Sequence, residues 1–491
     1  KSITESMKLK KSQIFYKYQN SKLIETCQIN LIRNSFNKKK DPKETVKSVQ
    51  NVQRKKNQEK QLKQRFSFPG RHAIIRGLVI SQYNIGYNFV TTLDYVFLRT
   101  ILRKEHCITE YQISWILILI LLSLCLGAVI GGGINDGLKN WKFQRKKGIL
   151  YGIVLGGLVI TAIPLIQKIT QNSSFVLIIM SILLCFSHFL IGTSYGPWFA
   201  LFKEVFTSKE RRGISFIIIG MGAFGALFAQ LIFSWILEID YSALIWVITG
   251  SSLIFTGILS TLFFTQTREK SNESNVKENL KELPKALYKL GGVLWGNILI
   301  VTLIWGISTH LIECGFIDAL TLRFTITFHT ATKVYLLMGA CSIVTLPFCL
   351  FLLNKMNVKV SILITSVIYA CFCGGLAFIT NFSLIYFLSF LGGIGNLLIS
   401  SLQITLPLDT IPRGKEASFC GIFLAISSIS KPLALVIQGW FLDNSSNISI
   451  TPRISDSYEI IFAIAGIITL FSIMTVLPFK IEEIQKDLAK I

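Results

Sequence analysis

The sequence predicts an all-α integral membrane protein with twelve transmembrane helices in two six-helix halves. Of its 491 residues, 51% are hydrophobic and only 16% are charged, and the mean hydropathy is +0.54. Soluble domains usually carry about 25% charged residues. Twelve segments approach or exceed the ~18 apolar residues that cross the hydrocarbon of a bilayer. They lack the alternation of barrel strands, so helices that satisfy their own backbone are expected.

A polar stretch with several Lys and Glu residues divides the segments into two sets of six. The expected domains are a basic cytoplasmic tail over 1–72, a first half over 73–264, a linker over 265–289, a second half over 290–479 and a cytoplasmic C-terminus over 480–491. The expected spans are about 74–102, 114–130, 148–166, 175–202, 213–237, 243–264, 291–316, 334–351, 361–379, 384–408, 419–441 and 460–478.

Basic residues gather in the loops on one side of the predicted bundle, which includes both termini. Because Lys and Arg are enriched in cytoplasmic loops, both termini are expected in the cytoplasm. Residues 1–66 hold 18 Lys and Arg against 5 Asp and Glu. This tail either touches anionic lipid or is a solvated, disordered segment. The sequence does not identify the membrane.

The sequence offers no pattern typical of an enzyme, a metal site or a nucleotide-driven pump. Most of the ten cysteines lie inside predicted spans, where they behave as small hydrophobic residues. The glycines of Gly220-Met-Gly222-Ala-Phe-Gly225 fall in the middle of a span, where they permit close helix packing rather than phosphate binding. We therefore expect no cofactor, no metal, no catalytic residue and no nucleic-acid partner.

A signature sequence joins the second and third spans. Gly132 lies four residues before Asp136, and a basic cluster that includes Arg145 and Lys146 follows. This pattern resembles the loop between the second and third helices of the major facilitator superfamily, a family of twelve-helix secondary transporters. The residue after the aspartate, Gly137, is an arginine in that family.

The loops after the fourth and tenth spans carry matching features, which strengthens the resemblance. Each has a proline, an acidic residue and an arginine near a glycine, and internal repeats of this kind build the transporter fold. The resemblance implies that these loop residues, with the signature, open and close the cytoplasmic side: Gly132, Asp136, Arg145, Lys146, Glu204, Arg212, Asp409 and Arg413. Asp136 is expected to accept hydrogen bonds from a helix N-terminus, where the helix dipole favours an anion. The alternative for the basic residues is ordinary anchoring at the membrane surface.

The resemblance also implies that the first, fourth, seventh and tenth spans line a central cavity. Polar or small side chains spaced about one helical turn apart follow one side of each of these spans. The resulting candidates for solute binding or ion coupling are Asn84, Asn88, Asp94, His188, Tyr195, Trp305, Thr309, His310, Glu313, Asn396 and Gln403.

Lys431 joins these candidates because it falls near the middle of the eleventh span, directly before Pro432. A charge there costs at least ~2.5–3.5 kcal/mol on insertion scales, so a carboxylate, a wet cavity or an anionic solute should face it. The expected alternatives are a solute contact, a structural ion pair with Glu313 or Asp94, and extension of the side chain to the membrane surface.

His310 and Glu313 lie three residues apart on the seventh predicted span. As a neighbouring pair they form a candidate proton-coupling site. The alternative places both in the wet outer third of the helix, near Asp318 and Arg323. The arginine that many proton-linked members carry in the fourth span is absent, and His188 is expected to be a buried, hydrogen-bonded histidine.

Together these patterns predict a carrier for a small polar or amphiphilic solute, anionic or zwitterionic, that works by alternating access. Its partners would be the solute, a coupled proton or sodium ion, and membrane lipid, and we expect a monomer. The alternative function is a receptor, scaffold or assembly factor with the same fold that acts through its basic N-terminal tail.

Overall fold

The computed structural model describes most of the two predicted helical halves. The described residues are 70–98, 100–102, 110–137, 144–169, 173–239, 241–262, 292–356, 358–408, 416–443 and 457–476. The predicted tail up to residue 69, the linker 265–289 and the C-terminus 480–491 lie outside them.

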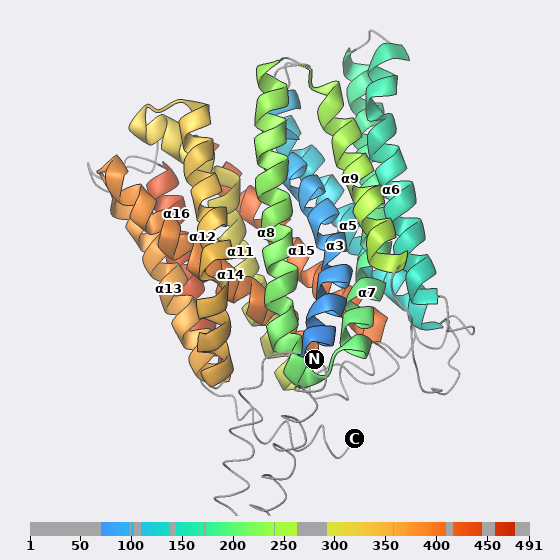
Figure 1. Ribbon diagram of the computed structural model, residues 1–491. Helices are drawn as coiled ribbons and strands as arrows, with labels where there is room; N and C mark the ends of the chain where they lie inside the picture. Colours follow the sequence, from blue (N-terminus) through green and yellow to red (C-terminus); the bar gives the residue numbers. More distant parts are fainter. Residues whose placement is uncertain are drawn as a thin grey trace, which may run out of the picture. The chain divides into compact units, whose positions relative to one another are not determined.

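The described residues form twelve long α-helices and one short π-helix, which run roughly side by side (Figure 1). The first half contains α3 (Arg71–Thr92), η1 (Leu93–Phe97), α5 (Glu110–Gly137), α6 (Gln144–Ile169), α7 (Ser173–Val205), α8 (Ser208–Glu238) and α9 (Ala243–Leu262). The second half contains α11 (Gly292–Phe324), α12 (Phe328–Lys355), α13 (Val358–Phe378), α14 (Phe382–Leu408), α15 (Glu416–Asp443) and α16 (Ser457–Val476).

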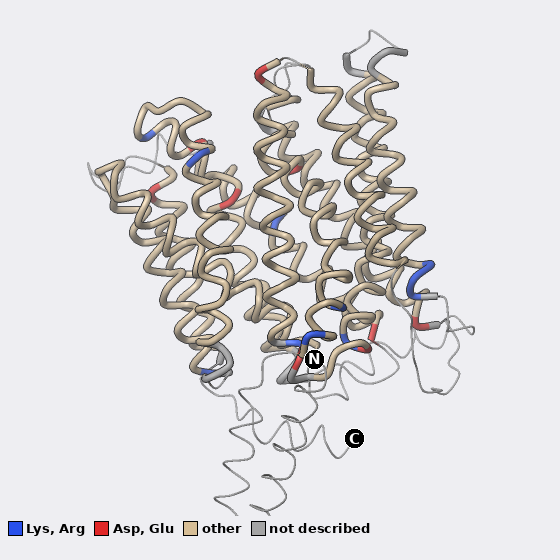
Figure 2. Tube along the Cα trace, viewed as in Figure 1, with Lys and Arg blue, Asp and Glu red and all other residues tan. Residues whose placement is uncertain are grey.

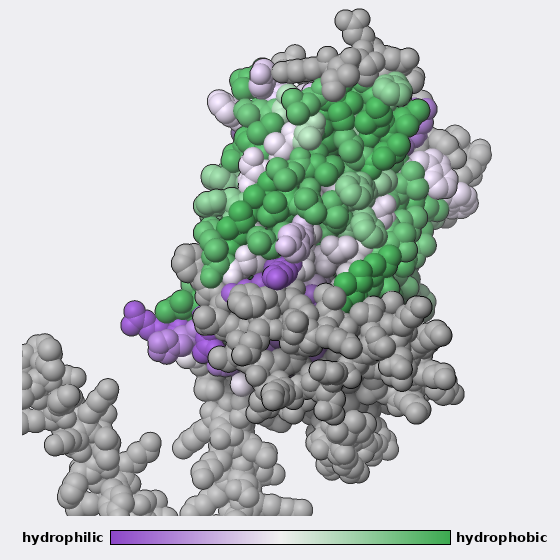
Figure 3. Space-filling model, turned by 90° about the vertical axis from the view of Figure 1, so that its right-hand side faces the viewer, coloured by the Kyte–Doolittle hydropathy of each residue, from purple (hydrophilic) through white to green (hydrophobic). Residues whose placement is uncertain are grey.

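Eleven of the described helices are long and apolar enough to cross a membrane. Figure 2 shows few charged positions along the middle of the helices, and Lys and Arg gather mainly at the lower end. One face of the molecule carries a broad hydrophobic band above a hydrophilic region (Figure 3). These features define a multi-pass integral membrane protein, as the composition predicts.

The remaining long helix, α3, carries more polar residues, and some of them form hydrogen bonds to neighbouring helices inside the first half. The hydroxyl groups of Tyr83 and Ser194 of α7 lie 3.1 Å apart, and Trp198 Nε1 donates to the carbonyl oxygen of Ile80 at 3.1 Å. Asn84 Nδ2 donates to the carbonyl oxygen of Ile218 in α8 at 3.0 Å. In a low-dielectric bundle such bonds hold helices together.

A comparable polar cluster joins three helices inside the second half. Trp305 Nε1 of α11 donates to Ser366 Oγ of α13 at 3.1 Å and to Ser472 Oγ of α16 at 3.0 Å. Ser308 Oγ, one turn further along α11, lies 2.6 Å from Thr469 Oγ1 of α16. This face of α11 is therefore used for packing.

The two halves meet where α5, α7 and α8 contact α12, α14 and α15. Glycines allow the closest approach: a Cβ on Gly132 of α5 would overlap the carbonyl oxygen of Ala417, and one on Gly421 of α15 would overlap that of Ala128. Within the first half, a Cβ on Gly225 would lie 2.7 Å from the carbonyl oxygen of Ile85. The prediction that the Gly220–Gly225 motif serves helix packing is confirmed.

The close contacts of some glycines predict that a larger side chain destabilises the protein at those positions and not at glycines that face open space. Gly86→Val should lower the midpoint of thermal unfolding, because its Cβ would lie 2.8 Å from Leu253 Cα and overlap Thr256 Oγ1 of α9. Overpacking of this kind typically costs about 1–3 kcal/mol. The matched control is Gly439→Val in α15, where no atom lies within 4 Å of an added Cβ. Equal midpoints for the two purified variants would contradict this account of the packing.

Candidate functional site

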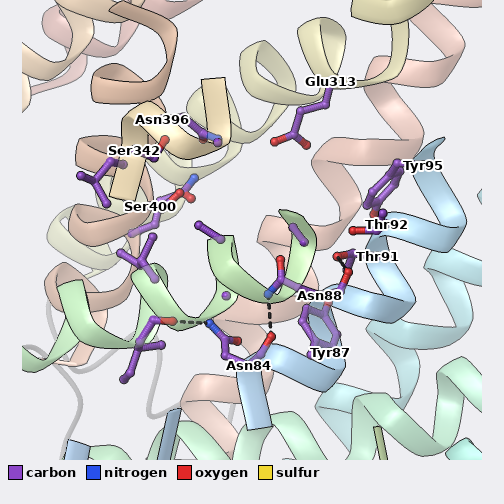
Figure 4. Close-up of a pocket in the computed structure, with 18 of the residues that line it drawn as sticks. Asn84, Tyr87, Asn88, Thr91, Thr92, Tyr95, Glu313, Ser342, Asn396 and Ser400 are labelled. Atoms are coloured by element: carbon purple, nitrogen blue, oxygen red, sulfur yellow. Dashed lines mark hydrogen bonds between the residues drawn. The ribbon is translucent and has the colours of Figure 1, made fainter. Parts of the chain in front are cut away.

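A cavity of about 330 Å³, lined by polar, aromatic and aliphatic side chains, lies between the two halves. Figure 4 shows residues of α3 and η1 on one side of it, Ser342, Asn396 and Ser400 across from them, and Glu313 pointing inward from α11. Eight sequence-predicted candidates line it: Asn84, Asn88, Tyr195, His310, Glu313, Asn396, Gln403 and Lys431.

Lys431 is the one Lys or Arg among the described residues that line the cavity. Its Nζ lies 4.3 Å from the centre of the Tyr95 ring, a cation–π contact that desolvation strengthens. Within the described part of the chain, no carboxylate lies within ion-pair distance of this ammonium group, although Glu313 and Asp94 are close enough to interact with it electrostatically. The predicted ion pair is therefore not formed directly, and the ammonium group faces the cavity.

Glu313 and His310 form the second charged element of the cavity. His310 Nδ1 lies 2.8 Å from Glu313 Oε2, and the two side chains are 12% and 21% exposed. Both residues line the cavity, whereas Arg323 lies further along α11 and pairs with Glu459 of α16 at 2.6 Å. The two residues are thus separate from the charges at the end of the helix.

The π-helix η1 directs two consecutive side chains to different halves of the protein. Asp94 Oδ2 lies 2.8 Å from His188 Nε2 of α7, in a pair buried inside the first half. The Tyr95 ring stacks on the His310 ring of α11, with centroids 6.1 Å apart, and also contacts Lys431. Single π-turns inside α-helices are frequent at functional sites. Here Tyr95 of the first half contacts both charged elements of the second half, Lys431 and the His310–Glu313 pair.

Amide side chains from the first half line the cavity opposite these charges. Asn88 Nδ2 donates to the Asn84 carbonyl oxygen at 2.7 Å, and Gly222 of α8 leaves room for both amides, because its Cβ would lie 2.8–2.9 Å from their nitrogens. Gln230 of α8 is 2% exposed, and its Nε2 finds no acceptor among the described residues. The cavity therefore contains a donor that a solute or water can satisfy.

An aromatic layer bounds the cavity along α7. Tyr195, Trp198 and Phe199 line it, and their rings pack on one another with centroids 5.0–5.8 Å apart. Tyr83 stacks on Trp198 at 5.0 Å. Further along α7, Glu204 belongs to the buried ionic cluster described next, so the aromatic layer separates the cavity from that cluster.

Asp136 of α5 binds the N-terminus of α15. Its carboxylate accepts from the Ser418 backbone N–H at 2.6 Å, the Ser418 hydroxyl at 2.7 Å and the Ala417 N–H at 3.2 Å. Such an end favours an anion because its N–H groups lack partners within the helix. The expected hydrogen bonds of Asp136 to a helix N-terminus are present, and they join the two halves.

Arg145, at the start of α6, is the centre of an ionic cluster in which its side chain is fully buried. Its guanidinium lies 3.3 Å from Asp136, 2.6 Å from Glu204 of α7 and 3.5 Å from Glu416 of α15. Three carboxylates from three helices thus converge on one planar cation, whose several donors suit such an arrangement. We call Asp136, Arg145, Glu204 and Glu416 the latch cluster.

A second contact between the halves joins α8 to α14. Arg211 donates to the carbonyl oxygens of Phe206 at 3.0 Å and Lys203 at 3.1 Å, and to that of Leu408 of α14 at 3.4 Å. Ser215 Oγ of α8 lies 3.1 Å from Ser401 Oγ of α14. Both contacts lie near the start of α8 and the end of α14.

Four of the predicted solute-site residues do not line the cavity. Trp305 and Thr309 are not among the cavity-lining residues, because Trp305 packs against α13 and α16 and Thr309 donates to the Gly306 carbonyl oxygen. Asp94 and His188 form a pair inside the first half, and that pairing agrees with the expectation of a buried, hydrogen-bonded histidine.

The structure places two of the other predicted latch residues. Glu204 pairs with Arg145. Lys146 is half-buried beside the cluster. The Arg212 side chain, Asp409 and Arg413 lie outside what the structure describes.

Sequence reasoning missed cavity residues on α8 and α12 and on the π-turn. Gln230, Tyr335 and Ser342 line the cavity, as do Tyr87 and Tyr95. These residues lie outside the polar stripes of the first, fourth, seventh and tenth predicted spans, although a glutamine in the apolar span of α8 is the same kind of signal. A π-turn leaves no signal in the sequence, so the orientation of Tyr95 could not be predicted.

Two bundled six-helix halves around a central polar cavity, joined by the latch cluster, define the fold of a secondary transporter. A family model of the Major Facilitator Superfamily matches residues 83–434, and this chain belongs to that family. No curated protein matches the chain in a sequence search.

Solved structures of the same fold include two transporters. The human organic anion transporter MFSD10 (TETRAN) has a TM-score of 0.60 and 11% identity, with 83% of this chain and 100% of that chain covered. The E. coli fucose:proton symporter FucP, in a variant form, has a TM-score of 0.59 and 14% identity, with 82% and 98% covered. At these identities the likeness concerns the fold alone.

The latch cluster predicts a specific effect of Arg145→Gln. Removing the cation leaves three carboxylates without their central partner, and breaking a buried pair in this way typically costs about 3–5 kcal/mol. The amides of Ala417 and Ser418, which donate to Asp136, should then exchange hydrogen for deuterium faster in mass spectrometry. The control is Lys147→Gln, at an exposed position two residues away. Unchanged exchange in the arginine variant would contradict the role of Arg145 as the centre of the cluster.

Proposed function

We propose that this protein is a secondary transporter that moves a small polar solute with an acidic group, anionic or zwitterionic, by alternating access. The observation that carries the proposal is the Lys431 ammonium group in the cavity, with no directly paired carboxylate among the described residues. A buried cation in a membrane protein needs an anion or water beside it. A solute carboxylate would be such an anion, and Gln230 supplies a further donor.

We further propose that the latch cluster closes the cytoplasmic side of the transporter. This orientation follows the excess of Lys and Arg in the loops on that side. The halves are in contact there through α5 with α15 and through Arg211 with Leu408. Opening toward the cytoplasm would require the bonds from Asp136 to Ala417 and Ser418 to break. The driving force would be the solute gradient or a coupled proton or sodium ion.

Uptake into proteoliposomes tests the function. The purified full-length protein would be given a mixed metabolite pool, with and without a pH gradient, and the contents analysed by mass spectrometry. We expect accumulation of acidic solutes above that of protein-free liposomes. If folded protein accumulates nothing, the alternative is favoured: a receptor or scaffold that acts through residues 1–72. Capture of a partner that depends on this tail would then support that alternative.

Lys431→Gln should lower the uptake of the identified solute at least about 10-fold, because a hydrogen bond to a charged group is worth ~1.5–3 kcal/mol. Lys431→Arg should retain part of it, since it keeps the charge. Lys333→Gln, at an exposed position in α12, is the control and should behave as the unmodified protein does. Full uptake and unchanged affinity in Lys431→Gln would refute the proposed solute contact.

A further inference from the structure

We propose that the solute is a zwitterion, such as an amino acid, whose carboxylate binds Lys431 and whose ammonium group binds Glu313. This inference rests on the proposed transport function and narrows its substrate class. The described residues that line the cavity include one Lys, one Glu and His310. With His310 neutral, these charges sum to zero. A bound monoanion would leave one uncompensated negative charge in a low-dielectric site, and a bound monocation one positive charge.

The two charges are also held apart, although both belong to the same half of the protein. Lys431 of α15 rests on the Tyr95 ring, and Glu313 of α11 is bound through Oε2 by His310. The Tyr95 ring lies against both Lys431 and His310. Among the described residues Glu313 Oε1 has no hydrogen bond, and no ion pair joins Glu313 to Lys431. A ligand with an anionic and a cationic group would bridge this separated pair.

The other groups near Glu313 and His310 do not alter this charge balance. Tyr95 from η1, Tyr335 from α12 and Tyr369 from α13 are neutral phenols, and Cys314 belongs to α11 itself. Asp94 is paired with His188, and Arg323 with Glu459. Tyr458 of α16 packs on Gly315. From α14, the lining side chains Asn396, Ser400 and Gln403 carry no charge.

The amides and rings of the first half suit the uncharged remainder of such a solute. Gln230 Nε2 lacks an acceptor within the described chain and can donate to a carboxylate or carbonyl oxygen. The layer of Tyr195, Trp198 and Phe199 offers an apolar surface. Zwitterion binding then places one fixed charge of the protein against each charge of the ligand and keeps the net charge of the cavity at zero.

The test measures binding of matched probes to the purified full-length protein by calorimetry. Each set keeps one side chain in three forms: the amino acid, the carboxylate that lacks the amino group, and the amine that lacks the carboxylate. The first set is L-leucine, 4-methylpentanoate and 3-methylbutylamine, and the set derived from the solute identified by uptake follows. We expect the amino acid of the latter set to bind at least about 10-fold more tightly than its carboxylate or its amine.

Charge-changing variants provide a readout that a structural role would not produce. Glu313→Gln leaves Lys431 alone in the cavity, so preference should shift from the amino acid to the carboxylate. Lys431→Gln leaves Glu313 alone, so preference should shift to the amine. The control is Glu238→Gln at the exposed end of α8, where the side chain is 62% exposed, and it should keep the preference for the amino acid.

Two results would overturn the inference without touching the proposed transport function. The first is tight binding of the carboxylate with uptake of about one proton per ligand in unbuffered solution, which would indicate an anion that binds together with a proton. The second is equal loss of all three probe forms in both variants. Failure of the transport function itself is recognised separately, because proteoliposomes would then accumulate no solute that carries an acidic group.

Discussion

The ionic contacts around the buried guanidinium of Arg145 join the two halves at one end of the bundle. This guanidinium of α6 pairs with Asp136 of α5 and Glu204 of α7 in the first half, and with Glu416 of α15 in the second. Asp136 adds hydrogen bonds to the N-terminus of α15, and glycines let α5 and α15 approach until their backbones touch. The guanidinium and the helix N-terminus offset part of the charge of the three carboxylates. The contacts of Arg145 with Asp136 and Glu204 lie within the first half, so only the contacts with Glu416 and with the N-terminus of α15 require the two halves to be together at this end.

The opposite arrangement of charge exists in the cavity, where Lys431 and Glu313 are present but not joined. Each is stabilised by a weaker neighbour, the Tyr95 ring or the His310 imidazole. Both neighbours can remain in contact while a solute binds, because a ring face and a ring nitrogen each occupy only one side of the charged group. The charged groups of the cavity thus remain available to a ligand. The surrounding amides, rings and any water reduce the free-energy cost of burying these charges. In the latch cluster oppositely charged side chains are in direct contact, whereas in the cavity Lys431 and Glu313 are not.

Much of the fold and part of the site could be predicted from the sequence, for physical reasons. Hydrocarbon requires long apolar helices, so the spans could be predicted from the sequence. Lys431 stood out because a charge inside a span is costly unless an anion or water lies beside it. Asp136 was readable from its motif. The face that each helix presents was not: Trp305 and Glu313 belong to the same polar stripe of α11, yet Trp305 bonds to α13 and α16. Polar side chains that fasten helices and those that bind solutes look alike until the neighbours are known.

The helix α15 connects the two sites, and this suggests how solute binding would reach the latch cluster. Ser418 binds Asp136 at the start of α15, and Lys431 lies thirteen residues later on the same helix, which corresponds to about 20 Å at the rise of an α-helix. A ligand that binds Lys431 would act on a helix whose N-terminal end is held to Asp136 by hydrogen bonds. Pro432, directly after Lys431 within α15, removes one backbone hydrogen bond at this point. A small change in the tilt of α15 at Lys431 would therefore displace Ser418, where the hydrogen bonds to Asp136 are short and sensitive to geometry.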